Sequence, residues 1–407
     1  MSTVSISPLS TEWSMRALAD KDPFPIYDNL RKRGDVIWDP GMNCWLVLSY
    51  DICKVIESDE NTFGITHVKD APPFWFEING GRTAVSSLIG EEHARMRRLY
   101  LKLLSPAATA QCREEHVLPV INDAVDRFEK HGQAELTTQL SDPLPTRVMA
   151  SMFGLPWKDD KLIADVTLWH RDIVAWLYNN TNEALTTKAK LASDELTNLF
   201  LPLVIERKEK RGTDLISQIW SRAPEDWGNV GVDDVIAIAR EMAIGAGETT
   251  TNAIANAIYL YLTNPSVREA VTNDQIGALN TFVEEILRLL GAIQFRFRQA
   301  NRDINLGGVS IKKDQTICML HAAANRDPTH YKCPHAIDLN RKPATDHVAF
   351  NVGPRICPGM HLARLKIREC LKVLMVRLPD LRLDPTKEAP RFHGFSHRSF
   401  GPLHVRF

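Results

Sequence analysis

Several features that would assign a protein class directly are missing from this sequence. Its seven cysteines form no C-x-x-C pair, so the usual zinc-ribbon and thioredoxin-like motifs are absent. No apolar run reaches the roughly 18 residues that a membrane-spanning helix needs. The 49 basic and 50 acidic residues nearly cancel, which excludes the strong overall cationic field of a typical nucleic-acid binder. We therefore expect neither a nucleic-acid partner nor a membrane association.

The first residues also lack the marks of secretion. Met1 to Leu9 contain no basic segment and no apolar segment, so no signal peptide is visible. The cysteines are then expected as thiols in a reducing, cytoplasmic, soluble setting. A composition of 44% hydrophobic and 24% charged residues is that of an ordinary globular protein. These observations indicate a soluble globular protein but do not identify its function.

The spacing of apolar residues predicts a mainly helical chain with a minor β part. Helical spacing runs from Glu91 to about residue 290 and returns from Met360 to Val376. A strand is expected at Cys44–Tyr50, a hairpin turn at Gly307-Gly308, and a loop over residues 71–87. No repeat or low-complexity linker divides the chain. We predict one large domain over residues 1–407.

The strongest chemical signal is the segment Phe350-Asn-Val-Gly-Pro-Arg-Ile-Cys-Pro-Gly359. It places Cys357 in a tight loop, bounded by glycine and proline, that leads directly into a helical pattern. Backbone N–H groups at a helix N-terminus stabilise a thiolate, and a nearby arginine adds to this effect. Such a thiolate acts as a nucleophile or as a metal ligand, although a lone cysteine is more commonly a buried structural residue.

The spacing Phe-x-x-Gly-x-Arg-x-Cys-x-Gly resembles the fingerprint of the cytochrome P450 family of haem-thiolate monooxygenases. The resemblance extends from about residue 20 to the end of the chain. It implies a single, mainly helical haem domain with a long central helix. It also implies haem b as cofactor, dioxygen as co-substrate, Cys357 as the iron ligand and Phe350 over the ligand's side of the ring. Asn351 departs from the family, in which glycine is common at this position.

A second motif, Glu285-Ile-Leu-Arg288, matches the Glu-x-x-Arg of the family. Residues i and i+3 share one face of a helix, so the two charges can pair. Most such pairs are surface salt bridges worth about 0–1 kcal/mol. The resemblance instead implies a buried pair that Arg341 joins, with a structural role.

A third motif, Gly245-Ala-Gly-Glu-Thr-Thr250, lies inside a helical run predicted from Asp233 to Thr263. A glycine inside a helix costs about 0.8–1 kcal/mol relative to alanine, so two of them need a reason. In the family, small residues here leave space for dioxygen where the central helix passes over the haem. By resemblance, Glu248 and Thr249 are the acid–alcohol pair that relays protons to the reacting oxygen.

The two haem propionates need cationic or hydrogen-bond-donating partners in a partly buried site. The resemblance assigns this role to histidines and arginines that are scattered along the sequence: His93, Arg97, Arg298, His347 and Arg355. Taken singly, each is an unremarkable side chain. The assignment rests on the fact that all five stand at positions where the family has propionate partners.

The residues at the family's substrate-contact positions indicate a class of substrate. By family position, the candidate pocket residues are Phe74, Trp75, Phe76, Ile244, Ile293, Gln294, Phe295 and Phe395. Five of these eight side chains are aromatic, which suits a small apolar or aromatic substrate but also suits a hydrophobic core. The tail from Arg391 resembles that of bacterial members that act on small aromatics, including aryl-ether O-demethylases. Hydroxylation or O-dealkylation of such a compound is the resulting hypothesis.

The chain ends without a flavin or iron–sulfur module, so electrons are expected from a ferredoxin and an NAD(P)H-dependent ferredoxin reductase. His361, Arg364 and Arg368 recur at helical spacing and, with Arg98 and Lys102, predict a basic surface for an acidic ferredoxin. Such basic stripes are also common on solvated helix faces.

Two other functional classes compete with a monooxygenase. A haem-thiolate sensor or carrier would use the same cysteine but would not need Glu248 and Thr249 beside a substrate cavity. A hydrolase is disfavoured, because Gly394-Phe-Ser-His-Arg398 lacks the final glycine of a nucleophile elbow.

Overall fold

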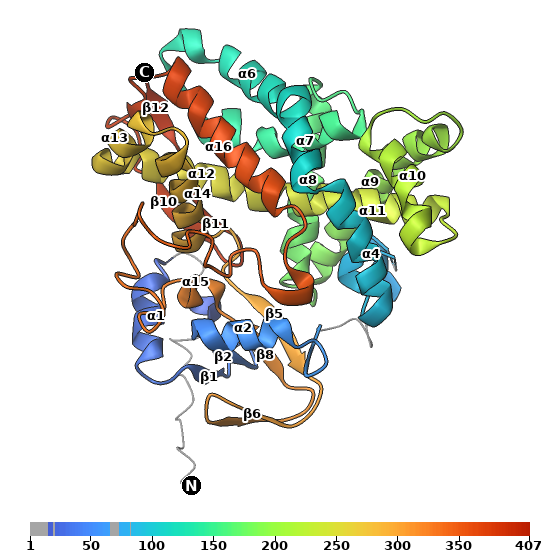
Figure 1. The fold of residues 1–407 in the computed structure, drawn as a ribbon, viewed down its shortest axis with the longest axis vertical. Coiled ribbons are helices and arrows are strands. Elements are labelled where there is room, and N and C mark those ends of the chain that lie inside the picture. The colour runs from blue at the N-terminus through green and yellow to red at the C-terminus, as the bar shows by residue number, and fades with distance from the viewer. Residues whose placement is uncertain (1–14, 19–20, 66–72, 82) are drawn as a thin grey trace. The chain divides into compact units, whose positions relative to one another are not determined.

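The structure is a computed structural model that describes residues 15–18, 21–65, 73–81 and 83–407. Contacts divide the chain into two compact units, and each unit is assembled from separate stretches of sequence. Unit 1 comprises Met1–His67, Ala255–Cys357 and Pro385–Leu403, and unit 2 comprises Val68–Ile254, Pro358–Asp384 and His404–Phe407. Helices make up most of the described chain, so the prediction of a mainly helical fold with a minor β part is confirmed (Figure 1).

Unit 1 contains a five-stranded sheet in the order β1-β2-β8-β5-β3. Its neighbouring strands are antiparallel except for the parallel pair β2 and β8. Apolar side chains of the sheet pack with Tyr50, Cys53 and Ile56 of helix α2 (Tyr50–Ser58) into one buried cluster. The strands span Val36–Asp39 (β1), Cys44–Val47 (β2), Phe63–Gly64 (β3), Arg296–Ala300 (β5) and Thr316–Met319 (β8).

The predicted hairpin at Gly307-Gly308 is confirmed. It joins β6 (Ile304–Leu306) to the antiparallel strand β7 (Val309–Ile311). The two glycines have φ values of +57° and +79°. A two-residue turn of this kind needs positive φ at both positions, and glycine adopts it without a Cβ clash.

The other elements of unit 1 are mostly short helices. A second antiparallel pair, β10 (Arg391–Gly394) and β11 (Arg398–Gly401), lies near the end of the chain. The helices are η2 (Met15–Leu18), α1 (Phe24–Arg31), α13 (Pro265–Asn273), α14 (Gly277–Leu289) and α15 (His321–Ala324), with the 3₁₀ turn η7 (Gly353–Arg355).

Unit 2 holds most of the long helices, together with a three-stranded sheet in the order β4-β12-β9 (Figure 1). These strands span Gln133–Glu135 (β4), His404–Arg406 (β12) and Arg382–Leu383 (β9). The helices are α3 (Pro73–Ile78), η3 (Val85–Ser87), α4 (Gly90–Leu103), α5 (Pro106–Cys112), η4 (Arg113–Val117), α6 (Leu118–Asp126), η5 (Glu129–His131), η6 (Thr137–Ser141), α7 (Pro143–Phe153), α8 (Asp160–Leu177), α9 (Glu183–Glu209), α10 (Leu215–Trp227), α11 (Val232–Ala246) and α16 (Met360–Arg377).

The uninterrupted helix predicted from Asp233 to Thr263 is wrong in one respect. The structure has α11 up to Ala246 and α12 (Glu248–Thr263), with a break at Gly247. Gly247 has ψ −98°, outside the helical range, and its carbonyl accepts from both Thr250 N (3.1 Å) and Thr251 N (3.2 Å). A Cβ at this position would lie 2.6 Å from Nδ1 of His170, so any other residue would force the ring or the backbone to shift.

The loop predicted over residues 71–87 also contains more structure than expected. Its described part includes α3, whose side chains Phe76 and Ile78 are buried. Proline is favoured at the first position of a helix, where its missing N–H costs nothing, and Pro73 occupies that position here. The proline and glycine content of the segment indicated a loop, whereas burial of its apolar residues favours a short helix.

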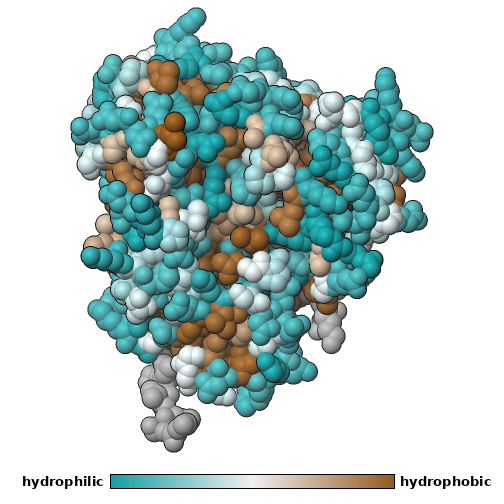
Figure 2. All heavy atoms as spheres, viewed as in Figure 1, coloured by the Kyte–Doolittle hydropathy of each residue, from teal (hydrophilic) through white to brown (hydrophobic). Residues whose placement is uncertain are grey.

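Figure 2 shows one face of the molecule, on which hydrophilic side chains predominate and hydrophobic ones form small groups. The large apolar side chains that are most exposed, such as Leu191 and Ile276, belong to different segments. Within the described ranges, no helix is both long and apolar enough to cross a membrane.

Candidate functional site

Cys357 lies at the end of a short hydrogen-bonded loop. Its N–H donates to the carbonyl of Phe350 at 2.7 Å, and the N–H of Ile356 donates to that of Gly353 at 3.2 Å. The cysteine is partly exposed, and α16 begins soon afterwards at Met360. The loop therefore presents a thiol from a backbone that its own hydrogen bonds constrain.

Two positions of this loop need a left-handed backbone. Gly353 has φ +68°, and a Cβ there would lie 2.8 Å from the carbonyl oxygen of Glu57 on α2. Asn351 has φ +59°, a region that asparagine adopts more readily than most residues. Asparagine can therefore replace the family's common glycine without changing the loop. Val352 N–H donates to Glu57 Oε2 at 2.9 Å and fastens the loop to α2.

Arg298 is suited to bind an anionic group of haem, because it is a buried cation on β5. Desolvation lowers the pKa of Arg298 to about 10, although the charge of Glu57 opposes the shift. Its guanidinium donates to the carbonyl of Phe297 at 3.0 Å. A buried cation that is destabilised in this way gains from a nearby anion, and a haem propionate is such an anion. Together with the Cys357 thiol, this donor set suits haem.

His347 and Arg355 are engaged with acidic residues of unit 1. His347 Nε2 lies 3.0 Å from Oε2 of Glu284, and its Nδ1 accepts from Ala349 N at 3.3 Å. Arg355 forms an ion pair with Glu60. Both residues therefore have protein partners, and their assignment to the propionates stays a prediction.

His93 and Arg97, the two remaining candidates for the propionates, lie on α4 in unit 2. Both side chains are buried, with 4% and 8% exposed. They are four residues apart, so they share one face of the helix. Their role toward haem also stays a prediction.

Glu285, Arg288 and Arg341 form a buried ionic cluster in unit 1. Arg288 donates to both carboxylate oxygens of Glu285, from Nε at 2.7 Å and from Nη2 at 2.8 Å, and neither residue is exposed. Arg341 Nε donates to Glu285 Oε1 at 2.8 Å, and the backbone N–H of Asp338 donates to Oε2 at 2.8 Å. Burial acts to raise the pKa of Glu285, but these partners together hold it below its usual value.

Glu248 and Thr249 begin α12, directly after the break at Gly247. Burial raises the pKa of Glu248 to about 7, with Arg171 lowering it and Asp142 raising it. Its Oε2 is buried and has no hydrogen-bond partner within the described part of the chain. Thr249 Oγ1 donates to the carbonyl of Gly245 at 3.0 Å. A carboxyl group with a pKa near neutrality can both take up and release a proton at physiological pH.

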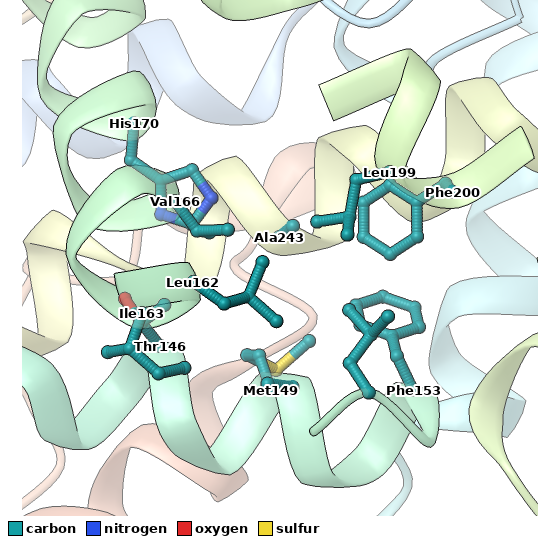
Figure 3. A pocket seen from close by; sticks show the side chains of 12 residues that line it. Thr146, Met149, Phe153, Leu162, Ile163, Val166, His170, Leu199, Phe200 and Ala243 are labelled. Carbon is teal, nitrogen blue, oxygen red and sulfur yellow. The ribbon is translucent and has the colours of Figure 1, made fainter. Parts of the chain in front are cut away.

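The sequence did not indicate a small apolar cavity between α7, α8, α9 and α11 (Figure 3). His170 lies at one end of it, and Phe153 and Phe200 lie at the other. The cavity volume is about 20 Å³, which is room for one water molecule and not for an organic substrate. Burial lowers the pKa of His170 to about 4, so its imidazole is neutral. Of the predicted pocket residues, none lines this cavity.

The predicted pocket residues fall into an aromatic group in each unit. In unit 2, the ring centroid of Trp75 lies 5.4 Å from Phe76 and 6.5 Å from Trp176, and Ile244 lies on α11. In unit 1, Phe295 and Phe395 make an edge-to-face contact with centroids 5.1 Å apart.

Three pocket candidates of unit 1, Ile293, Gln294 and Phe295, are engaged in contacts with other parts of the chain or are fully buried. Ile293 forms a β-bridge with His397. Gln294 and Phe295 have no exposed surface, and Gln294 Nε2 donates to the carbonyl of Gly291 at 2.7 Å. Of Phe295 and Phe395, only Phe395 is partly exposed. Contact with a substrate stays a prediction for all of them.

The sequence pattern that defines the family described as "Cytochrome P450" matches residues 41–393, which is most of the chain. The chain belongs to the cytochrome P450 family. The resemblance inferred from the cysteine loop is confirmed. As a cytochrome P450, the protein is a monooxygenase that uses haem, a cysteine thiolate ligand and dioxygen.

Known cytochromes P450 resemble this one along most of their length. The putative cytochrome P450 YjiB of Bacillus subtilis is 26% identical over 362 residues, which are 88% of each protein. The C-19 steroid 1alpha-hydroxylase of Sorangium cellulosum is 29% identical, over 77% of this chain and 78% of that protein. The crystal structure of CYP109E1 from Bacillus megaterium in complex with testosterone has a TM-score of 0.81 at 25% identity, over 95% of this chain and 97% of that one.

Proposed function

We propose that this cytochrome P450 hydroxylates or O-dealkylates a small apolar or aromatic substrate and works as one haem domain over residues 1–407. The observation that carries the proposal is the aromatic character of the predicted pocket segments. Trp75 and Phe76 contact each other in unit 2, and Phe295 contacts Phe395 in unit 1. Aromatic side chains offer large apolar surfaces with preferred ring geometries, which suit a compact ring system.

The residues proposed to hold the cofactor are Cys357, as the iron ligand, and Arg298, for a propionate. His93 and Arg97 are proposed for the propionates on the evidence of their burial and shared helix face. Haem supplies the activation of dioxygen when it is bound, and the thiolate favours cleavage of the O–O bond. The protein's own task is to orient the substrate, to exclude water and to deliver protons.

We propose that Glu248 delivers those protons, with Thr249 beside it. Because its pKa is about 7, the carboxyl is half protonated near pH 7, and the protonated fraction falls as pH rises. Replacing Glu248 with glutamine should lower the rate of product formation by about 10²-fold, which is typical for loss of a positioned general acid. In the wild type, the amount of product formed per dioxygen consumed is expected to decline above about pH 7, and Glu248→Gln should remove this pH dependence.

The control for this prediction is Asp233→Asn, which neutralises an exposed carboxylate on α11. This variant should keep the wild-type pH profile. An unchanged profile in Glu248→Gln would contradict the proton-delivery role.

The proposed electron donor is a ferredoxin served by an NAD(P)H-dependent reductase. The proposed location is the cytoplasm, where reducing conditions keep cysteines as thiols. Two of the predicted docking residues have acidic partners on α10. Arg98 Nε lies 3.2 Å from Asp226 Oδ1, and Lys102 Nζ lies 2.8 Å from Asp226 Oδ2 and 3.0 Å from Glu225 Oε2. His361, Arg364 and Arg368 share a face of α16, and Arg368 Nε lies 3.2 Å from Glu369 Oε1. We propose that these three residues, together with Arg98 and Lys102, form the docking surface.

A spectroscopic screen tests the substrate class. Small methoxyarenes and alkylphenols are compared with C-19 steroids for the ability to shift the absorption of the resting haem. Steroids belong in the panel because one relative is named for a C-19 steroid and one similar structure holds testosterone. We expect the small aromatics to bind and to yield a product with one labelled oxygen atom when ferredoxin, reductase and isotopically labelled dioxygen are supplied.

Other outcomes decide between the alternatives. Binding of steroids alone would contradict the proposed substrate size. Binding of small aromatics without any product would instead favour a haem-thiolate sensor or carrier.

A further inference from the structure

Two adjacent charged residues of α11 hold a segment of unit 2 that carries three predicted pocket residues. The segment begins with α3, turns at Gly80-Gly81 and ends with η3. The two glycines have φ values of +99° and +116°. A Cβ on Gly81 would lie 3.1 Å from the Cβ of Ala237, so the glycine backbone lies directly against α11.

Arg240 binds the C-terminal end of α3. Its Nη2 donates to the carbonyl oxygens of Glu77 at 2.7 Å and Ile78 at 3.3 Å, and to Oγ of Ser193 on α9. Ser193 Oγ in turn donates to the Glu77 carbonyl at 2.8 Å. The last carbonyls of a helix lack partners within the helix, so these donors satisfy them. Burial lowers the pKa of Arg240 to about 10, which leaves the guanidinium charged at neutral pH.

Glu241 binds the N-terminal end of η3. Its two carboxylate oxygens accept from Val85 N at 2.6 Å and from Ser86 N at 2.7 Å. The Tyr100 hydroxyl of α4 donates to Oε2 at 2.7 Å. Asn79 Nδ2 donates to Ser86 Oγ at 3.1 Å and closes the turn between the two ends. Hydrogen bonds to a carboxylate are about twice as strong as neutral ones, so this end is firmly held.

We propose that Arg240 and Glu241 are positioning residues that orient Phe74, Trp75 and Phe76 and thereby set the size of the ligands that this cytochrome P450 accepts. The inference rests on the proposed function, in which these aromatic side chains face the substrate. Because Arg240 holds one end of the segment and Glu241 the other, loss of either residue weakens the attachment of one end while the other stays held. Trp75 would then lose its fixed packing against Trp176, whose ring centroid lies 6.5 Å from that of Trp75.

The test uses two nitrogen ligands of haem iron, imidazole as a small probe and clotrimazole as a bulky one, whose binding is read from the absorption spectrum of the holoprotein. In Glu241→Gln, the affinity for clotrimazole relative to imidazole should rise about tenfold, or about 1.4 kcal/mol. Amide hydrogen exchange in the peptides that cover Trp75–Asn79 and Val85–Leu88 should become faster. Glu241→Asp keeps the charge and should restore part of both effects, whereas Asp233→Asn on the same helix should change neither.

If Glu241→Gln does not fold, Arg240→Lys provides the same readouts, because lysine keeps the charge but loses the planar fork. Faster exchange with an unchanged ligand ratio would overturn the inference, and so would unchanged exchange. The proposed function fails separately: a wild-type protein that binds neither probe would contradict the haem site, while the exchange data would still report on the segment.

Discussion

Replacing Cys357 with alanine should abolish the absorption band that carbon monoxide gives with a reduced, thiolate-ligated haem. The loop around Cys357 is held by backbone hydrogen bonds to the Phe350 carbonyl and to Glu57 of α2, so the alanine variant should keep the loop and lose only the thiol. Alanine has no metal-binding atom, and monooxygenase turnover should be lost with the band. The measurement is the difference spectrum of the reduced protein with and without carbon monoxide.

Cys333→Ala is the matched control, because Cys333 is exposed and lies on the same unit. It should leave the band intact. The assignment of Cys357 is wrong if the wild type lacks the thiolate-type band or if the band survives in Cys357→Ala.

Replacing Arg288 with alanine should lower the free energy of unfolding by about 3–5 kcal/mol, because it leaves Glu285 buried with an incompletely compensated charge. Arg288 also donates to three backbone carbonyls, those of Asn325 at 2.9 Å, Pro334 at 2.7 Å and Ala336 at 2.9 Å. Those acceptors would lose a buried partner in the variant. The midpoint of urea unfolding, followed by circular dichroism, measures the effect.

Arg95→Ala is the control for Arg288→Ala. Arg95 pairs with Glu91 at 2.8 Å on α4, but both side chains are largely exposed. Exposed pairs of this kind contribute about 0–1 kcal/mol. A loss in Arg288→Ala no larger than in Arg95→Ala would show that burial does not decide the value of the ion pair. Arg341→Ala, which removes the more exposed of the two arginines, should fall between them.

Short sequence motifs predicted those parts of the site whose functional residues all lie within one short segment. The cysteine loop and the Glu-x-x-Arg pair each fit within about ten residues, and spacing on a loop or a helix face is enough to describe them. Asn351 shows the limit of such patterns. It looked like a departure from the family, but its φ of +59° makes asparagine an acceptable substitute for glycine.

Contacts between distant segments could not be predicted in the same way. The sequence placed Glu284 and Glu60 in no role, yet they partner His347 and Arg355. The attachment of the 73–88 segment to Arg240 and Glu241 joins residues more than 150 positions apart. No local periodicity reports which backbone carbonyl or N–H a charged side chain will meet.

The sequence by itself determined the family and the mainly helical fold, and it supplied the candidates for the thiolate ligand and the acid–alcohol pair, because each depends on residue type at short, regular spacing. Only the tertiary structure decided that the helix predicted from Asp233 to Thr263 breaks at Gly247, where the ring of His170, on another helix, leaves too little space for a Cβ. It also decided which basic side chains are already paired and which carboxyl titrates near pH 7. Burial and charge compensation are properties of the packed chain, so they can be determined only when the positions of distant segments are known.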